Sequence, residues 1–150
     1  MSEKFSPKEV QLNIRSSLCD LSPAGLPDGD AENTEISAKG YIRYASDGAT
    51  LISYEEDSEG GRIYSNIRIC GRKVTVARRG AIESSMVFDE GVIHKSRYSM
   101  PPYEMDMEIF TEKIRQTVGF GEIQLKLIYK MKVGGSLRHC IFILTSKEIN

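Results

Sequence analysis

Residues 123–135 read IQLKLIYKMKVGG, and this stretch decides the fold. From Ile123 to Val133 every second side chain is apolar, and most of the residues between them are polar. Such alternation gives a β-strand one buried face and one solvated face. The glycine pair that follows, Gly134-Gly135, is typical of a tight turn between antiparallel strands. The stretch therefore predicts a long strand followed by a hairpin turn.

The same pattern recurs along the chain. Residue pairs that end in glycine separate the alternating runs at 47–48, 60–61, 70–71, 79–80 and 90–91. The runs predict about ten strands. They lie at residues 10–18, 34–44, 49–56, 62–70, 73–79, 84–88, 92–100, 105–116, 121–133 and 137–147. Gly40 lies on the apolar face of the second run, which indicates a bulge or a close approach of two backbones.

Helical alternatives exist for residues 6–18 and 104–118. Val10, Leu12 and Ile14 are spaced by two, and the second window has no apolar stripe at a spacing of three to four, so strand is favoured in both. A sheet of this many strands with no helices to cover it must close on itself or split into two layers. Long strands with short turns favour closure. The predicted fold class is therefore all-β, a single antiparallel up-and-down β-barrel of about 8–10 strands.

The chain of 150 residues predicts one β-barrel domain. Residues 1–9 are expected to form a flexible N-terminal arm. Residues 20–33 are expected to form the one long loop, because Pro23, Gly25, Pro27 and Gly29 interrupt any regular structure there.

Composition argues against several partners and locations. Lys plus Arg number 20 against 21 for Asp plus Glu, so the basic excess of a nucleic-acid-binding protein is absent. Residues 1–9 have no apolar segment, so no secretory signal is expected, and no apolar run is long enough to cross a membrane as a helix. The three cysteines are odd in number and widely spaced, which favours free thiols and a cytoplasmic location.

Arg78 is the sharpest candidate for a functional residue. It continues the face of Val74 and Val76, so it is expected to point into the barrel, where an unpaired charge is costly. Glu55 is the candidate partner, or Glu56 if Ile52 and Tyr54 point inward instead. Arg78 is then either an anchor for an anionic ligand or half of a structural ion pair.

Tyrosines supply further candidate ligand-binding residues. Tyr54, Tyr98, Tyr103 and Tyr129 are expected to line a cavity together with Arg78 and Glu55, and their hydroxyl groups would serve as polar contacts. His94 and His139 lack the spacing of a metal site, and no nucleophile–base set is recognisable. We therefore expect no metal, no cofactor and no catalytic residues, and an enzyme is the least favoured class.

An ordered set of short motifs indicates a family. It consists of Ser53-Tyr54-Glu55-Glu56, the strand from Arg62 to Ile69, Val76-Ala77-Arg78-Arg79-Gly80-Ala81, Met86-Val87-Phe88-Asp89-Glu90-Gly91, Tyr98 with Pro102-Tyr103, Thr111-Glu112, and Gly121-Glu122-Ile123 leading to Tyr129. From Lys39 to Ser146 the chain thereby resembles the YwiB-like family of uncharacterised bacterial proteins.

The resemblance implies a small cytosolic barrel of calycin-like, lipocalin type with no established activity. Met100-Pro101-Pro102-Tyr103-Glu104 departs from the Thr-Pro-Tyr-Gly that this family tends to have. The loop at residues 20–33 also looks long, and both changes would reshape the mouth of a barrel.

Two functions compete. The first is binding of a small, partly apolar or anionic (amphipathic) ligand inside the barrel, lined by residues such as Met105 and Met107. The second is a filled barrel that acts as a protein-interaction or homo-oligomerisation module, with a homodimer as its simplest form. The second function is suggested by the strand at 137–147, which is apolar on both faces. Phe142 and Leu144 are expected at that interface.

Overall fold

The protein folds into ten β-strands joined by short turns. The structure, a computed structural model, describes residues 7–119 and 122–149. The strands are β1 (Lys8–Asp20), β2 (Glu32–Tyr44), β3 (Thr50–Ser58), β4 (Gly61–Cys70), β5 (Lys73–Gly80), β6 (Glu83–Phe88), β7 (Ile93–Met100), β8 (Tyr103–Val118), β9 (Ile123–Val133) and β10 (Ser136–Glu148). No helix occurs within the described ranges.

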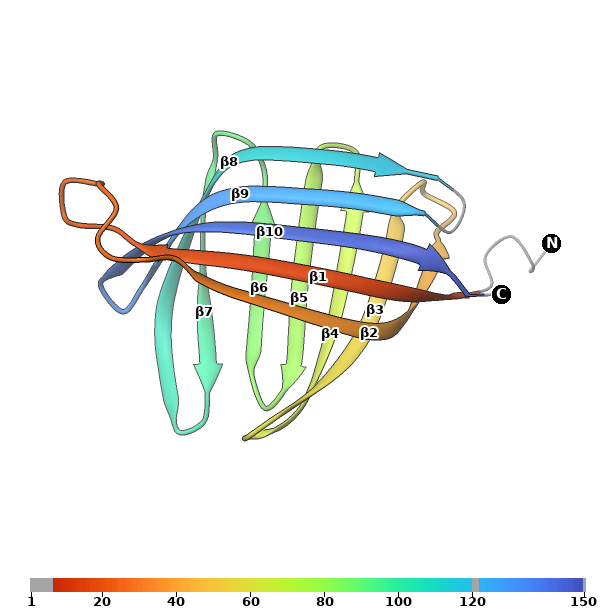
Figure 1. The fold of residues 1–150 in the computed structure, drawn as a ribbon, viewed down its shortest axis with the longest axis horizontal. Helices are drawn as coiled ribbons and strands as arrows, with labels where there is room; N and C mark the ends of the chain where they lie inside the picture. Colours follow the sequence, from red (N-terminus) through yellow and green to blue (C-terminus); the bar gives the residue numbers. More distant parts are fainter. Residues whose placement is uncertain (1–6, 120–121, 150) are drawn as a thin grey trace.

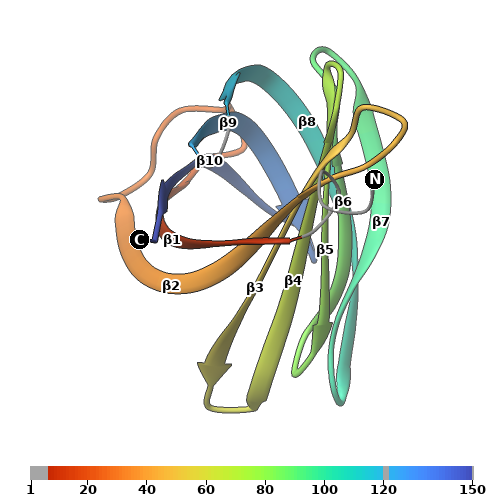
Figure 2. The ribbon, with the colours of Figure 1, turned by 90° about the vertical axis from the view of Figure 1, so that its right-hand side faces the viewer.

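The strands form one closed antiparallel barrel in which each strand pairs with its neighbours in the sequence. β1 completes the circle, because it pairs with β2 on one side and with β10 on the other. In Figure 1, β8, β9, β10 and β1 cross the front at a steep angle to β4–β7 behind them. Figure 2 shows the curved wall from the side. The prediction of an all-β up-and-down barrel is confirmed, and both windows with a helical alternative are strands.

The long link between β1 and β2 is shorter than predicted. It covers residues 21–31 and contains one isolated bridge between Leu21 and Pro27. It projects from one end of the barrel in Figure 1. The predicted flexible arm at 1–9 falls mostly outside the described residues. Its last two residues, Lys8 and Glu9, already belong to β1 and lie opposite Ile42 and Tyr41 of β2.

Alternating side chains of the strands form the core inside the barrel. The fully buried ones include Leu12, Ile42, Ile52, Ile67, Val74, Phe88, Met107, Leu125, Leu127 and Leu144. Phe142, at 6% exposure, and Leu144 lie in this core, so the expectation that they form an outer interface is wrong. The outer face of β10 is made instead by the odd-numbered residues, among them Ile141 and Ile143, which are half-buried. A strand that is apolar on both faces gives no sign of which face points inward.

Gly40 marks a close approach of strands, as predicted. A Cβ atom at this position would lie 2.5 Å from Leu12 Cδ1 and 2.7 Å from the backbone oxygen of Ser53. Real Cβ atoms do not come so close to other heavy atoms. The residue must therefore be glycine for β2 to pack against β3 and the core.

Side-chain hydrogen bonds satisfy backbone groups at one end of the barrel. At the end that holds the β4–β5 and β6–β7 turns, the Glu90 carboxylate accepts the Ile114 N–H at 2.7 Å. This N–H follows a β-bulge between Thr111 and Lys113. The Gln116 amide donates to the Gly71 carbonyl at 2.6 Å, and the Ser146 hydroxyl accepts the Ile123 N–H at 2.8 Å. We call this the capped end.

Gly40→Ala should destabilise the protein by about 1–3 kcal/mol, because the added methyl group overpacks the contact between β2 and β3. Chemical denaturation in urea measures the change. Lys39→Ala, at the exposed neighbouring position, is the control and should change stability by less than about 0.5 kcal/mol. Equal effects of the two substitutions would contradict the close approach.

The three cysteines should react at different rates. All three are free; Cys70 is exposed, Cys19 is partly buried and Cys140 is buried. Burial raises the pKa of the Cys140 thiol to about 11, which suppresses the reactive thiolate near neutral pH. A thiol reagent should therefore modify Cys70 first and Cys140 only after unfolding, and the denatured, unreduced protein should titrate as three thiols. Recovery of a single thiol would contradict this assignment.

Candidate functional site

Five polar residues form one row across the inside of the barrel. Tyr54 of β3 lies opposite Ser65 of β4, Ser65 opposite Arg78 of β5, Arg78 opposite Ser84 of β6, and Ser84 opposite Tyr98 of β7. Directly opposite residues on one face have Cβ atoms about 4.5–5.5 Å apart. Arg78 thus has a serine on each side and a tyrosine beyond each serine. We call these five residues the inner polar row.

Two atoms of this row are buried without a hydrogen-bond partner among the described residues. They are the Ser65 hydroxyl, in a residue only 1% exposed, and Arg78 Nε. The Ser96 hydroxyl, on the same face of β7, is in the same situation. Buried polar groups are normally hydrogen-bonded, since an unsatisfied one costs about 1–3 kcal/mol. Unsatisfied groups gathered in one place indicate a site for an acceptor.

Tyr129 approaches Arg78 from the opposite wall. Its ring packs edge-on against Phe88, with ring centres 4.8 Å apart. Burial raises the pKa of the Tyr129 hydroxyl well above its ordinary value, and the positive charge of Arg78 acts in the opposite direction. The Tyr129 hydroxyl is therefore neutral near neutral pH.

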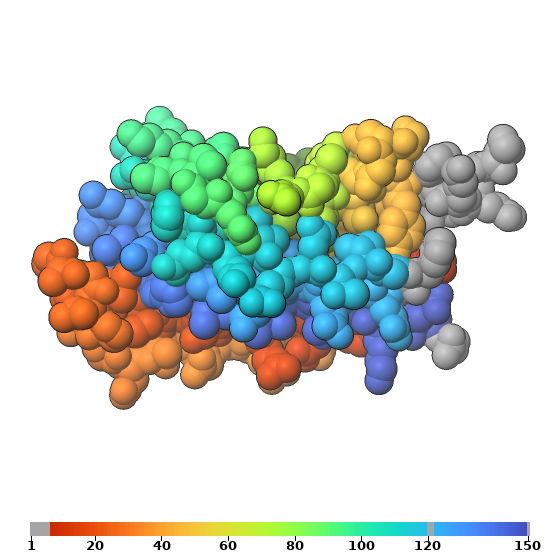
Figure 3. All heavy atoms as spheres, turned by 90° about the horizontal axis from the view of Figure 1, so that it is seen from above, coloured from red at the N-terminus to blue at the C-terminus, as the bar shows by residue number. Residues whose placement is uncertain are grey.

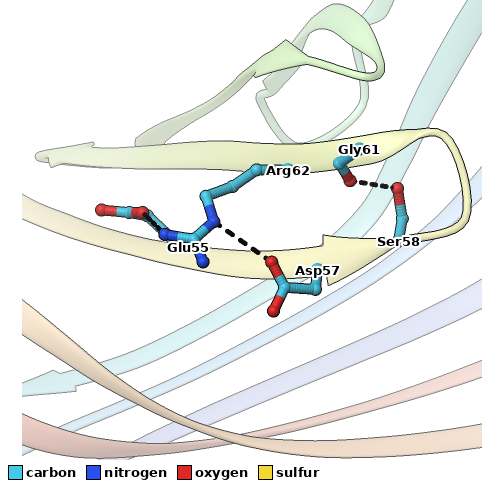
Figure 4. A network of polar contacts seen from close by, with 5 residues as sticks. All are labelled: Glu55, Asp57, Ser58, Gly61 and Arg62. Carbon is cyan, nitrogen blue, oxygen red and sulfur yellow. Dashed lines mark hydrogen bonds and ion pairs between the residues drawn. The ribbon is translucent and has the colours of Figure 1, made fainter.

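The predicted ion pair between Arg78 and Glu55 is wrong. Glu55 points outward, because Ile52 and Tyr54 occupy the inner face of β3. Its carboxylate binds Arg62 Nη1 at 3.0 Å, and Asp57 binds Arg62 Nε at 3.1 Å (Figure 4). These hydrogen bonds, first that to Asp57, raise the pKa of Arg62.

Glu56 shares the inner face of β3, which was the alternative that the sequence left open. It is half-buried, yet it forms no ion pair with Arg78 among the described residues. Arg78 is thus a partly buried cation whose partner the described chain does not supply.

Of the remaining predicted site residues, Tyr98 belongs to the inner polar row and Tyr103 does not. Tyr98 packs against the core and lies directly opposite Met105 of β8. Tyr103 is 63% exposed, at the start of β8, and takes no part in the row. The serines at 65, 84 and 96 were missed. Ser65 carries a signal in hindsight, since it is the one polar residue in an inner face of isoleucines at 63, 67 and 69.

The wall of the barrel is weakest beside this row. β6 and β7 pair at only two positions, Glu83 with Ser99 and Ser84 with Tyr98. The other neighbouring strands pair at five positions or more. Strand separation here would expose the inner polar row before any other part of the interior.

The histidines lie away from the row. His139 of β10 bonds Glu112 at 2.8 Å on the outer face, and His94 is half-buried near the capped end of β7. No group of three or more potential metal ligands occurs within the described ranges. Hollows of about 460 Å³ and 360 Å³ lie outside the barrel, over β2, β3 and β4, where Tyr41, Ser53 and Asn66 line both.

Comparison with known proteins places these features in a family. The chain is 24% identical over 112 residues to the "Uncharacterized beta-barrel protein YwiB" of Bacillus subtilis. This match covers 75% of this chain and 78% of that protein. The crystal structure of ywiB protein from Bacillus subtilis superposes with a TM-score of 0.86 over 99% of this chain and 98% of the other, at 20% identity. No helix in the described residues is long and apolar enough to cross a membrane. The model of the family described as "Domain of unknown function (DUF1934)" matches residues 25–141, and the chain belongs to this family, as the resemblance to the YwiB-like proteins implied.

Proposed function

We propose that the protein binds a small anionic molecule inside the barrel, with the acidic group of the ligand on Arg78. The observation that carries the proposal is the pair of unpartnered buried atoms, Arg78 Nε and the Ser65 hydroxyl, which stand opposite each other on neighbouring strands. A guanidinium group can only donate hydrogen bonds, and its fork fits a carboxylate or a phosphate.

The neighbouring hydroxyl groups complete a binding site for oxygen atoms. Ser65 and Ser84 flank Arg78, and Tyr54 and Tyr98 stand beyond them. An anion with two or three oxygen atoms would accept hydrogen bonds from the guanidinium and from these hydroxyls at once. Such charge-assisted bonds are roughly twice as strong as neutral ones.

The apolar part of the ligand would lie beside the row. Met105 pairs with Tyr98, and Met131 packs against the core on the facing wall. Methionine side chains adapt to irregular shapes. The ligand is thus amphipathic, enters where β6 and β7 are least paired, and uses the barrel in the lipocalin-like, calycin-type manner. Free thiols are consistent with this role being played in the cytoplasm.

A protein-interaction module is the second candidate. The half-buried Ile141 and Ile143 on the outer face of β10 favour it, because a closed barrel needs only one apolar face per strand. A homodimer through this face is the simplest form, and analytical ultracentrifugation at micromolar concentration tests it.

Arg78→Met should leave the unliganded protein equally stable or stabilise it. Replacing a buried charge by an apolar side chain of similar volume is often neutral or stabilising by about 1–4 kcal/mol. Denaturation in urea measures this, with the outward Arg79→Met as the control. If Arg78 were half of a buried ion pair, its loss would cost about 3–5 kcal/mol. A loss of that size would make Arg78 a structural residue.

Octanoate or octyl phosphate should stabilise the wild type and Arg79→Met but not Arg78→Met. At about 100 times its Kd a ligand adds about 2.7 kcal/mol, or roughly 5–10 °C in Tm for a domain of this size. Octanol, which has the same chain without a charge, should shift none of the three. The two anions distinguish a carboxylate from a phosphate. Equal responses of Arg78→Met and Arg79→Met, or no response of the wild type, would overturn the proposal.

A further inference from the structure

The outer face of four adjacent strands carries a regular grid of cations. In one row of opposite residues, Arg115 of β8 is followed by Lys126 of β9, Ile143 of β10 and Arg15 of β1. In the next row, Lys113 is followed by Ile128 and Ile141. Lys130 stands beside His139 in the row after that. We call this surface the basic face. Figure 3 shows the atoms of β8 and β9 side by side in the space-filling view.

The cations of the basic face are unpaired. They are Arg15, Lys113, Arg115, Lys126 and Lys130, and none forms an ion pair with a described residue. Two carboxylates lie beside these cations, Glu112 next to Lys113 and Glu35 directly opposite Arg15, and both bond other side chains. Glu112 bonds His139 at 2.8 Å, and Glu35 accepts a hydrogen bond from Asn13 at 2.9 Å. Five cations without an ion pair to a described residue thus lie on one wall of a chain whose net charge is -1.

Aliphatic side chains lie in the middle of these cations. Ile128 is directly opposite Ile141, and Ile143 is the next outward residue along β10. All three are half-buried, so they form a low apolar strip between the longer charged side chains. An apolar centre within a polar rim is the usual anatomy of a protein–protein interface.

The closure of the barrel limits how a partner can dock. Every one of the ten strands is paired on both sides, so the basic face offers no free edge for an added strand. A partner must therefore bind through side chains. Complementary charge would fix its orientation and speed its association.

Other occupants fit the basic face less well. A second copy in a two-fold dimer would set the same cations against each other. A single-stranded nucleic acid would find cations, but it also needs aromatic side chains on which its bases stack. Among the outward residues in and beside these rows, Phe110 is the one aromatic side chain. A membrane surface needs apolar side chains that project, whereas the three isoleucines lie low between the charged groups.

We infer that the basic face binds a partner protein whose surface carries acidic side chains around an aliphatic patch. This inference is independent of the proposed ligand, since the basic face and the inner polar row share no residue. It narrows the second candidate function to one class of partner and disfavours the homodimer.

The test measures binding of a labelled synthetic peptide of about 20 residues with leucine and glutamate at helical spacing, by fluorescence anisotropy. Lys113→Glu combined with Lys126→Glu should weaken binding at least about tenfold, because each change replaces an attraction by a repulsion. Arg43→Glu combined with Arg72→Glu changes the net charge equally, at exposed cations outside the basic face, and should weaken binding less than about twofold. Ile141→Ser should weaken binding while leaving the charges in place.

Competing occupants are tested in parallel with a 20-nucleotide thymidine strand, phosphatidylserine vesicles and sedimentation of the protein alone. Circular dichroism confirms that each variant keeps its strands. Selective loss in the Lys113/Lys126 double variant and in Ile141→Ser supports the inference. Four results would overturn the inference. The first three are equal loss in both double variants, tighter binding to the thymidine strand or to the vesicles, and a wild-type dimer that these variants dissociate. The fourth is no binding of the peptide up to about 1 mM, well beyond the range of specific interfaces.

Discussion

The pairing of β1 with β10 is the constraint on which the rest of this structure depends. These strands, one from each end of the chain, pair from Val10 with Glu148 to Asp20 with Arg138. Their pairing closes the sheet, so no strand is left with an unpaired edge. Closure also fixes each residue as inward or outward, because a slip of one residue would carry Leu12 and Ile14 to the solvent.

This fixed alternation explains why two consecutive arginines have different surroundings. Arg79 points outward and is exposed, whereas Arg78 lies inside among serines and tyrosines. The capped end shows that the chain can satisfy a buried polar group, since the Ser146 hydroxyl accepts the buried Ile123 N–H there. Four buried side-chain atoms of the described residues lack a hydrogen-bond partner, and two of them, at Ser65 and Arg78, lie on directly opposite residues of neighbouring strands.

Most of the fold could be predicted from the sequence, because alternation and glycine turns are local signals. The ten predicted strands match the observed ones to within a few residues at each end. The choice of face was not predictable where both faces are apolar, as with Leu51 and Ile52 or with Ile141 and Phe142. Glu55 and Phe142 were misplaced for this reason. Arg78 was placed correctly because Val74 and Val76 identify the inner face of β5, and residue 78 lies on the same face.

The inner polar row was harder to predict than its central residue. It depends on the register of five strands, and register follows from the geometry of each turn. The same register separates the two candidate surfaces. On β9, Tyr129 points inward toward Arg78, while its neighbours Ile128 and Lys130 belong to the basic face. One strand thus serves both surfaces with alternate residues. A side chain on the basic face can therefore be exchanged without altering the inner wall, so the two surfaces can be changed independently.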